Sequence, residues 1–257
     1  MYHSITFGNM NTWDDWHLVP STRPVFNPPS LKKKTLEIPG GNGVIDLSES
    51  LTGYPLYNNR EGSLEFIVMN DYKSWEEAYS DIMDYLHGQY MQAFLEDDPE
   101  YYYEGRFKVN SWKSDSKWSL ITIDYSLAPY KTKIETTKSD ILFVTSTNKS
   151  FTFNSEFYGK APVCPVFDVE TSSNLGVNVT FVNTELGLRE TKKLYNGKIQ
   201  VPEFVFYGPL ATIYIRVAGS SLYLDDSNGE AITDSSGNEI TTDASGNVTV
   251  SCNQGRL

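Results

Sequence analysis

A single segment of this chain has the period of an amphipathic α-helix, and this limits the fold more than any other feature. Ser74 and Glu77 have the spacing of a capping box, in which two side chains satisfy free backbone donors of the first turn. Apolar residues follow at i, i+4, i+7 and i+11, and Gly88 can end the helix in a left-handed conformation. The opposite face is acidic, so we expect this helix to lie on a sheet.

The other ordered segments have the patterns of β-strands. In the first half we predict strands at 34–39, 44–47, 63–69, 90–95, 101–109 and 118–125, with a Gly-rich turn at 40–43 joining the first two as a hairpin. From 141 to 218 no helical period occurs, and short strands recur about every ten residues, at 141–144, 150–153, 166–169, 177–182, 191–195 and 212–217. The chain is therefore predicted to be mainly β, with an antiparallel sandwich in its second half.

A polar, charged stretch at 131–140 marks a domain boundary. We expect an N-terminal domain at 1–135 and a C-terminal domain at 136–257. From about residue 224 the sequence changes, because Asp/Ser/Gly-rich turns recur at Asp226, Asp234 and Asp243, each followed by a short Thr/Ile/Val piece. Such a segment has little apolar surface to bury, so it is expected to form thin hairpins or a loosely ordered arm.

The acidic charge of the chain bears on its partners. The formal net charge is −12, which disfavours nonspecific nucleic-acid binding. Between Ser74 and Gly105 there are many acidic residues and no Lys or Arg. Two readings are open for this stretch: a solvated face that keeps the protein soluble, or a surface that meets basic partners or repels DNA.

The sequence has no membrane or secretion signal that we can identify. No apolar run approaches the roughly 20 residues that cross a bilayer, and the N-terminus lacks a basic start and an apolar core. We therefore expect synthesis in a cytoplasm and no membrane partner. Cys164 and Cys252 are far apart in sequence; a reduced core thiol and a tail thiol are favoured over a disulfide.

No residue pattern in the chain predicts catalysis. His3, His17 and His87 lack the spacing of zinc ligands, and no nucleophile elbow or phosphate-binding loop occurs. Acidic pairs are too abundant to single out an acid and a base. The segment at Asp226 matches only part of a calcium loop. We predict that the chain is not an enzyme and needs no cofactor or metal.

An ordered series of short motifs in the first 130 residues resembles one known family. The motifs are Phe7-Gly8-Asn9, Thr12-Trp13-Asp14-Asp15-Trp16, Pro39-Gly40-Gly41-Asn42-Gly43, Asp46-Leu47-Ser48-Glu49 and Tyr57-Asn58-Asn59-Arg60, followed by the strand at 64–68 and the capped helix. Together they look like the N-terminal domain of the distal tail proteins (Dit) of siphophages. The second half matches less closely, through Glu156-Phe157-Tyr158-Gly159, Pro162-Val163-Cys164-Pro165 and a strand rhythm.

This resemblance implies a structural role at the tip of a phage tail. It implies an N-terminal β-sandwich with one flanking α-helix and a projecting hairpin, and a C-terminal jelly-roll or galectin-like β-sandwich. In that family the first domain forms a hexameric ring that joins the tail tube to the tail-associated hub protein, with receptor-binding proteins as further partners. The expected ring or hairpin interface includes Asp46, Leu47, Tyr54, Tyr57 and Arg60.

A second hypothesis is a carbohydrate-binding module that contacts host cell-wall glycan through the C-terminal sandwich. The candidate glycan contacts are Phe157, Tyr158 and Tyr207, with Phe204 and Phe206 beside them in the pattern. The competing reading for all five side chains is burial in the sandwich core. The two hypotheses are compatible, because a ring subunit can also carry a sugar site.

Overall fold

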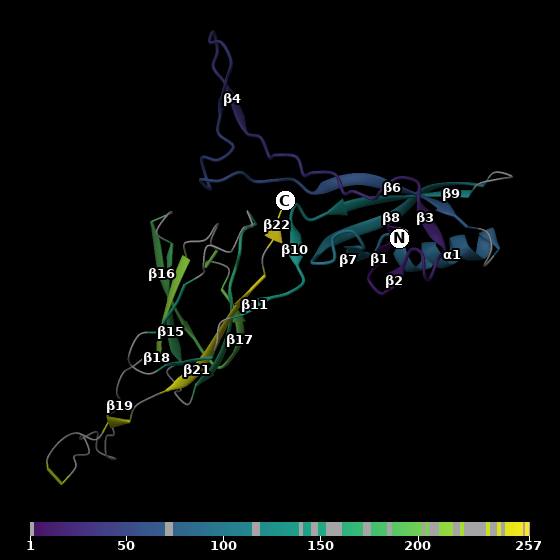
Figure 1. Ribbon diagram of the computed structural model, residues 1–257. Coiled ribbons are helices and arrows are strands. Elements are labelled where there is room, and N and C mark those ends of the chain that lie inside the picture. Colours follow the sequence, from purple (N-terminus) through teal and green to yellow (C-terminus); the bar gives the residue numbers. More distant parts are fainter. Residues whose placement is uncertain are drawn as a thin grey trace. The chain divides into compact units, whose positions relative to one another are not determined.

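The computed structural model describes residues 3–69, 74–114, 119–138, 141–144, 149–152, 161–171, 176–183, 187–201, 204–205, 211–217, 222–223, 235–236, 241–242, 245–253 and 255–256. The chain divides into two compact units, Met1–Ile134 and Glu135–Arg256. Antiparallel strands make up most of both, and α1 (Trp75–Leu86) is the one helix among the described residues. The predicted mainly β fold is therefore confirmed (Figure 1).

The first unit contains one curled antiparallel sheet. Its strands are β1 (Ile5–Phe7), β2 (Met10–Asn11), β3 (Leu18–Pro20), β6 (Arg60–Val68), β7 (Tyr90–Leu95), β8 (Tyr101–Ser114), β9 (Ser119–Leu127) and β10 (Lys131–Lys133). Their order is β2-β1-β7-β8-β9-β6-β3, and β10 also pairs with β8. The remaining strands of this unit, β4 (Thr35–Glu37) and β5 (Val44–Asp46), pair with each other as a separate hairpin.

Period-two alternation decides which face of this sheet is buried. In β9 every second residue from Ser119 to Leu127 is buried, and those from Ile121 onward join side chains of β1, β6 and β8 in one core. The pairing of β8 with β9 shifts between Val109 and Ser111 at a β-bulge. Beyond the bulge Trp112 lies opposite buried Ile121, and its ring stacks on the helix residues Trp75 and Tyr79 at centroid distances of 4.5 and 4.3 Å.

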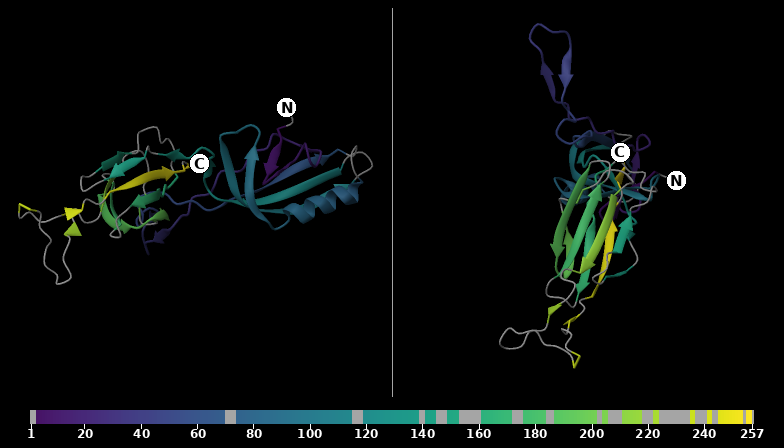
Figure 2. Two further views of the ribbon diagram at one scale, coloured as in Figure 1. Left: turned by 90° about the horizontal axis from the view of Figure 1, so that it is seen from below. Right: turned by 90° about the vertical axis from the view of Figure 1, so that its left-hand side faces the viewer.

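The helix α1 confirms the sequence pattern in detail. The hydroxyl of Ser74 accepts from the backbone N–H of Glu77, and the Glu77 carboxylate accepts from the backbone N–H of Ser74. Ile82 and Leu86 are buried against the sheet, and Gly88 has φ of 76°, the left-handed conformation that glycine adopts without strain. The helix lies along one face of the sheet (Figures 1 and 2). No helix among the described residues is both long and apolar enough to cross a membrane.

The second unit contains two larger antiparallel sheets and one separate pair of short strands. One consists of β11 (Thr137–Lys138), β21 (Gly246–Cys252), β14 (Val166–Thr171) and β17 (Gly197–Gln200) in that order, with β12 (Leu142–Val144) also on β21. The other has the order β13 (Lys149–Thr152), β18 (Ala211–Val217), β15 (Val177–Asn183) and β16 (Leu188–Leu194). β19 (Leu222–Tyr223) pairs with β20 (Thr241–Thr242), and β22 (Gly255–Arg256) ends the described residues.

Both sheets of the second unit contribute to one hydrophobic core. Phe167, Val169, Val248 and Val250 come from the first sheet, and Val179, Phe181, Ile213 and Ile215 from the second. Phe204 is fully buried with them and stacks on Phe181 at 5.5 Å. The six strands predicted for this region each correspond to a strand of the structure, within one to three residues at most ends.

The structure corrects the prediction for the C-terminal segment. Residues 246–252 do not belong to an arm: β21 pairs with β14 over six residues, and Val248 and Val250 are fully buried. The strand pairs with residues about 80 positions earlier in the chain, and its sequence neighbourhood of polar turns gives no hint of those partners. Of the repeats at Asp226, Asp234 and Asp243, the three aspartates themselves lie outside the described residues.

Cys164 and Cys252 are not joined by a disulfide, but the tail thiol expected at Cys252 is instead part of the hydrophobic core. Cys252 is buried at the inner face of β21, and this burial raises the pKa of its thiol to about 12. The Cys164 thiol donates to the carbonyl oxygen of Val201 at 3.1 Å. At neutral pH the Cys252 thiol is therefore protonated and packs as a small apolar group.

Candidate assembly surfaces

The hairpin formed by β4 and β5, with its stem, is the most exposed part of the first unit. We call residues 28–59 the hairpin arm. Within β4 and β5 all six residues are exposed, and the strands extend away from the sheet of their unit (Figure 2). Leu36 lies opposite Ile45, and the turn between the strands uses Gly40 and Gly43 at φ of 77° and 80°.

One face of the hairpin arm is apolar. Side chains alternate across a strand, so Leu36, Ile38, Ile45 and Leu47 share one face while Glu37, Val44 and Asp46 share the other. The exposed fractions of Leu36, Ile38 and Ile45 are 53%, 48% and 42%, and Leu51 near the stem is 98% exposed. An isolated two-stranded hairpin is only marginally stable in water, and a contiguous apolar face is a usual mark of an interaction site.

Backbone bonds hold the stem of the arm in an antiparallel arrangement. The N–H of Leu47 donates to the carbonyl of Lys34, that of Lys32 to Leu56, and that of Asn58 to Ser30, each at 2.8 Å. The Asp46 carboxylate accepts from Ser48, and these hydrogen bonds lower the pKa of Asp46 below its ordinary value. The arm is therefore an ordered projection whose apolar face is set in register by its stem.

Arg60 lies buried at the base of the arm, and the interface role expected for it stays a prediction. Its side chain is buried, with Nε donating to the carbonyl of Pro129 at 2.9 Å and one terminal nitrogen donating to the carbonyl of Asn27 at 3.0 Å. The guanidinium also lies 5.5 Å from the centre of the Tyr103 ring. Burial lowers the pKa of Arg60. Arg60 thus joins both ends of the arm to the sheet, within its own unit.

The other four predicted interface residues lie at two levels of the arm. Asp46 and Leu47 are in the upper part, where Asp46 is exposed and Leu47 half-buried. Tyr54 and Tyr57 are half-buried near the foot, where the Tyr57 ring meets Tyr130 edge-on at 6.0 Å. Burial, together with Tyr57 and Tyr54, raises the pKa of Tyr130. Asp46 and Leu47 therefore lie beside the hairpin strands, whereas Tyr54 and Tyr57 lie near the foot of the arm.

Sequence reasoning missed the apolar face itself. The pattern indicates only ordinary strand residues at Leu36, Ile38 and Ile45, and such residues are normally covered by the sheet they belong to. The available signal was the glycine-rich turn between two very short strands, with Pro28, Pro29 and Pro55 isolating them from longer strands on either side.

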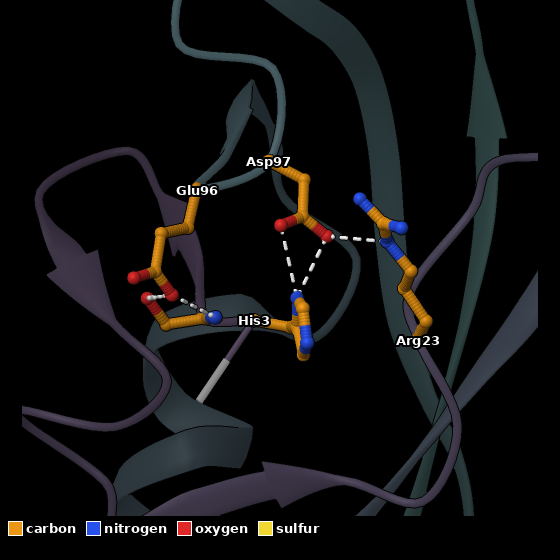
Figure 3. A network of polar contacts seen from close by, with 5 residues as sticks. His3, Arg23, Glu96 and Asp97 are labelled. Carbon is orange, nitrogen blue, oxygen red and sulfur yellow. Dashed lines mark hydrogen bonds and ion pairs between the residues drawn. The ribbon is translucent and has the colours of Figure 1, made fainter. Parts of the chain in front are cut away.

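A second cluster of polar residues ties the N-terminal segment to the turn after β7 (Figure 3). The Asp97 carboxylate accepts from the His3 ring at 2.9 Å and from Arg23 Nε at 2.8 Å, and Glu96 accepts from the backbone N–H of Ser4 at 2.8 Å. The hydrogen bond from His3, and then Arg23, lowers the pKa of Asp97. Because the carboxylate is held between two donors, the cluster has the character of a structural clasp.

A cavity of about 630 Å³ lies over the outer face of the curled sheet, between β6, β8, β9 and the end of the helix. One charge pair lies in it: Asp124 lies 3.6 Å from Lys108 and also accepts from Asn110 at 3.1 Å, and Arg106 donates to the carbonyl of Gly88. Such mutual pairing is typical of a solvated sheet face.

The predicted glycan contacts Phe157, Tyr158 and Tyr207 lie outside the described residues, as does Phe206. Phe204 is fully buried, which agrees with the competing core reading for that side chain. The glycan hypothesis for these residues therefore stays a prediction.

Among known proteins, similarity to this chain is found at the level of structure and not of sequence. No protein-family model and no curated protein sequence matches it. Among solved structures, it is similar to the crystal structure of Dit (gp 19.1) of SPP1, described as a paradigm of the hub adsorption apparatus in phages that infect Gram-positive bacteria. The likeness is one of fold. It covers 99% of each chain at 14% identity, with a TM-score of 0.57, so both units contribute to it.

Proposed function

We propose that this chain is a structural subunit of a bacteriophage tail tip, which assembles with copies of itself and with other tail proteins. The observation that carries this role is the fold similarity to a phage hub adsorption protein over 99% of both chains. A likeness confined to one β-rich unit would mean little, because such units serve many functions. Here the similarity extends over both units.

In its finer form, the role is that of a distal tail hub. Six copies form a ring through an N-terminal domain at 1–135, one face of the ring meets the tail tube, and the other meets the tail-associated hub protein and receptor-binding proteins. The C-terminal domain at 136–257 is a jelly-roll or galectin-like sandwich. The protein is made in the bacterial host cytoplasm and resides at the virion tail tip. This role is structural and requires no catalytic site or cofactor.

The hairpin arm supports self-assembly on physical grounds. Its apolar face, with Leu36, Ile38 and Ile45 each more than 40% exposed, is costly in water, at roughly 25 cal/mol per Å² of apolar surface. A neighbouring copy that covers this face recovers that free energy at each contact of a closed ring. In a closed ring every copy has a neighbour, so the apolar face of every arm is covered.

The mass of the purified protein in solution tests self-assembly. Light scattering over a concentration series is expected to give a discrete species whose mass is a whole multiple of the 29.1 kDa chain. The expected mass is that of six chains, or of twelve chains if two hexameric rings pair. A mass of one chain at every concentration would contradict assembly through the arm.

A further inference from the structure

The outer face of one sheet in the second unit holds a groove with an unusual set of side chains. The groove is open to solvent, has a volume of about 550 Å³ and is formed by β12, β14, β17 and β21. Its walls include Phe143, Asp168, Glu170, Asn196 and Asn247. None of these side chains is used by the assembly role proposed above, and the volume falls within the range of small-ligand sites.

Strand register places three of these residues in a row. Asn247 of β21 lies opposite Phe143 of β12 on one side and opposite Glu170 of β14 on the other. Neighbouring strands are roughly 5 Å apart, so the row spans roughly 10 Å, about the length of one or two sugar rings. Val169 and Val248, the chain neighbours of Glu170 and Asn247, are buried in the core, so the row faces outward.

The rim of the groove is fixed by a side-chain clasp. The Asn196 amide oxygen accepts from the backbone N–H of Thr171 at 2.7 Å, and its nitrogen donates to the Thr171 carbonyl at 3.1 Å. At Gly246 a Cβ would come within 2.8 Å of the Glu170 carbonyl oxygen, so the two strands approach closely at this end. The side chains of the row therefore stand on a rigid frame.

Phe143 and the two carboxylates are open to a ligand. Phe143 is 57% exposed. It is the middle residue of β12, and because the next residue, Val144, is fully buried, the Phe143 ring lies on the opposite, outer face. Asp168 and Glu170 are exposed as well, and among the described residues no hydrogen bond or ion pair engages either carboxylate. An aromatic face thus stands beside an amide and two unengaged carboxylates.

This combination matches a neutral saccharide. A sugar ring has an apolar C–H face that packs on an aromatic ring, and hydroxyls at its edge that donate to carboxylates and exchange hydrogen bonds with amides. The carboxylates disfavour anionic ligands such as nucleic acids and phosphate polymers. They also argue against a protein interface core, where Asp and Glu are depleted.

We propose that the groove around Phe143, Asn247 and Glu170 binds a neutral saccharide, with the Phe143 ring stacking on the sugar and the Glu170 and Asn247 side chains bonding its hydroxyls. The site does not rest on the tail-tip role and uses residues other than the aromatic cluster predicted from the sequence.

Isothermal titration of the full-length protein with cellotriose, maltotriose, triacetylchitotriose and lactose, each to about 10 mM, tests the site. At least one of these sugars is expected to bind saturably. Phe143→Ala and Glu170→Gln are each expected to weaken that binding about tenfold or more. Tyr214→Ala is the matched control, because Tyr214 is an exposed aromatic of the same unit that does not line the groove; it should leave binding unchanged. Hexalysine is the comparison ligand.

Three outcomes would overturn the site. The first is that none of the four sugars binds saturably. The second is that a sugar binds but Phe143→Ala leaves this binding intact. The third is that hexalysine binds and the sugars do not, which would identify a surface for basic peptides. Because Phe143 is exposed, its replacement should not unfold the unit, and an unchanged circular dichroism spectrum checks this. Solution mass reports separately on the assembly role, so failure of one does not imply failure of the other.

Discussion

At the residue scale, Arg60 shows why burial of a charged side chain is hard to foresee. Its sequence neighbourhood, Asn58-Asn59-Arg60-Glu61, is polar and gives no sign of a buried position. The guanidinium is accommodated because two backbone carbonyls and an aromatic face come from residues 27, 129 and 103, which are distant in sequence. Arginine suits such a site because its planar group is more weakly hydrated than an ammonium.

Arg60→Ala should destabilise the first unit by about 1–3 kcal/mol, because two partly buried carbonyls lose their donors and the packing of the buried side chain is lost. Urea unfolding followed by tryptophan fluorescence measures this, since all five tryptophans lie in the first unit. Arg106→Ala is the control: that side chain is exposed and its loss should cost less than about 1 kcal/mol. Equal losses in the two variants would contradict the role assigned to Arg60.

Asp97 makes a prediction about pH. Its pKa in the folded protein is lowered from the ordinary 3.8, first by the hydrogen bond from His3 and then by Arg23. A lowered pKa means that the stabilisation is complete above the unfolded value and is lost as pH falls through the folded value. Thermal melts of the protein and of Asp97→Asn should therefore differ by a constant amount above about pH 5, and the difference should shrink as pH falls below the ordinary value of 3.8. A difference independent of pH down to strongly acidic conditions would contradict this reading.

At the scale of elements, the helix was the most predictable because its signals are local. The cap, the apolar stripe and the stop at Gly88 all lie within 15 residues, from Ser74 to Gly88. The strands were also predictable, since alternation is visible along each one. Their partners were not, because pairing such as that of Val248 with Val169 depends on residues far apart in the chain.

Removing the helix cap gives a direct check on the energetics of α1. Ser74→Ala should lower the free energy of unfolding of the first unit by about 1 kcal/mol, because the N–H of Glu77 loses its acceptor. Ser80→Ala, in the exposed middle of the same helix, should be neutral or slightly stabilising because alanine has the higher helix propensity. Urea unfolding with fluorescence detection distinguishes them. A neutral Ser74→Ala would show that the capping box contributes nothing.

The hairpin arm carries the prediction on assembly. Replacing the paired residues Leu36 and Ile45 by serine should shift the solution mass toward one chain, because the apolar face no longer gains from being covered. Val25→Ser is the control, since Val25 is 67% exposed in the same unit but lies outside the arm. Tryptophan fluorescence should show both variants folded. Assembly that survives the double replacement would move the interface away from the arm's apolar face.

At the scale of the whole molecule, the sequence predicted a mainly β chain, the single helix and the projecting hairpin. It could not predict that residues 246–252 return to the centre of a sheet, or that Phe143, Asn247 and Glu170 line up across three strands. Both depend on register between distant segments, which composition and period do not encode. The candidate site in each unit is therefore visible only once the strands are paired.

The central claim is that copies of this chain close into a ring through the hairpin arm, and electron microscopy of the purified protein tests it most directly. The salt concentration should be about 0.5 M, where the repulsion expected from a net charge of −12 per chain is largely screened. Class averages are expected to show closed rings of six copies with each arm lying on its neighbour. Isolated single chains, or open filaments without closure, would contradict it.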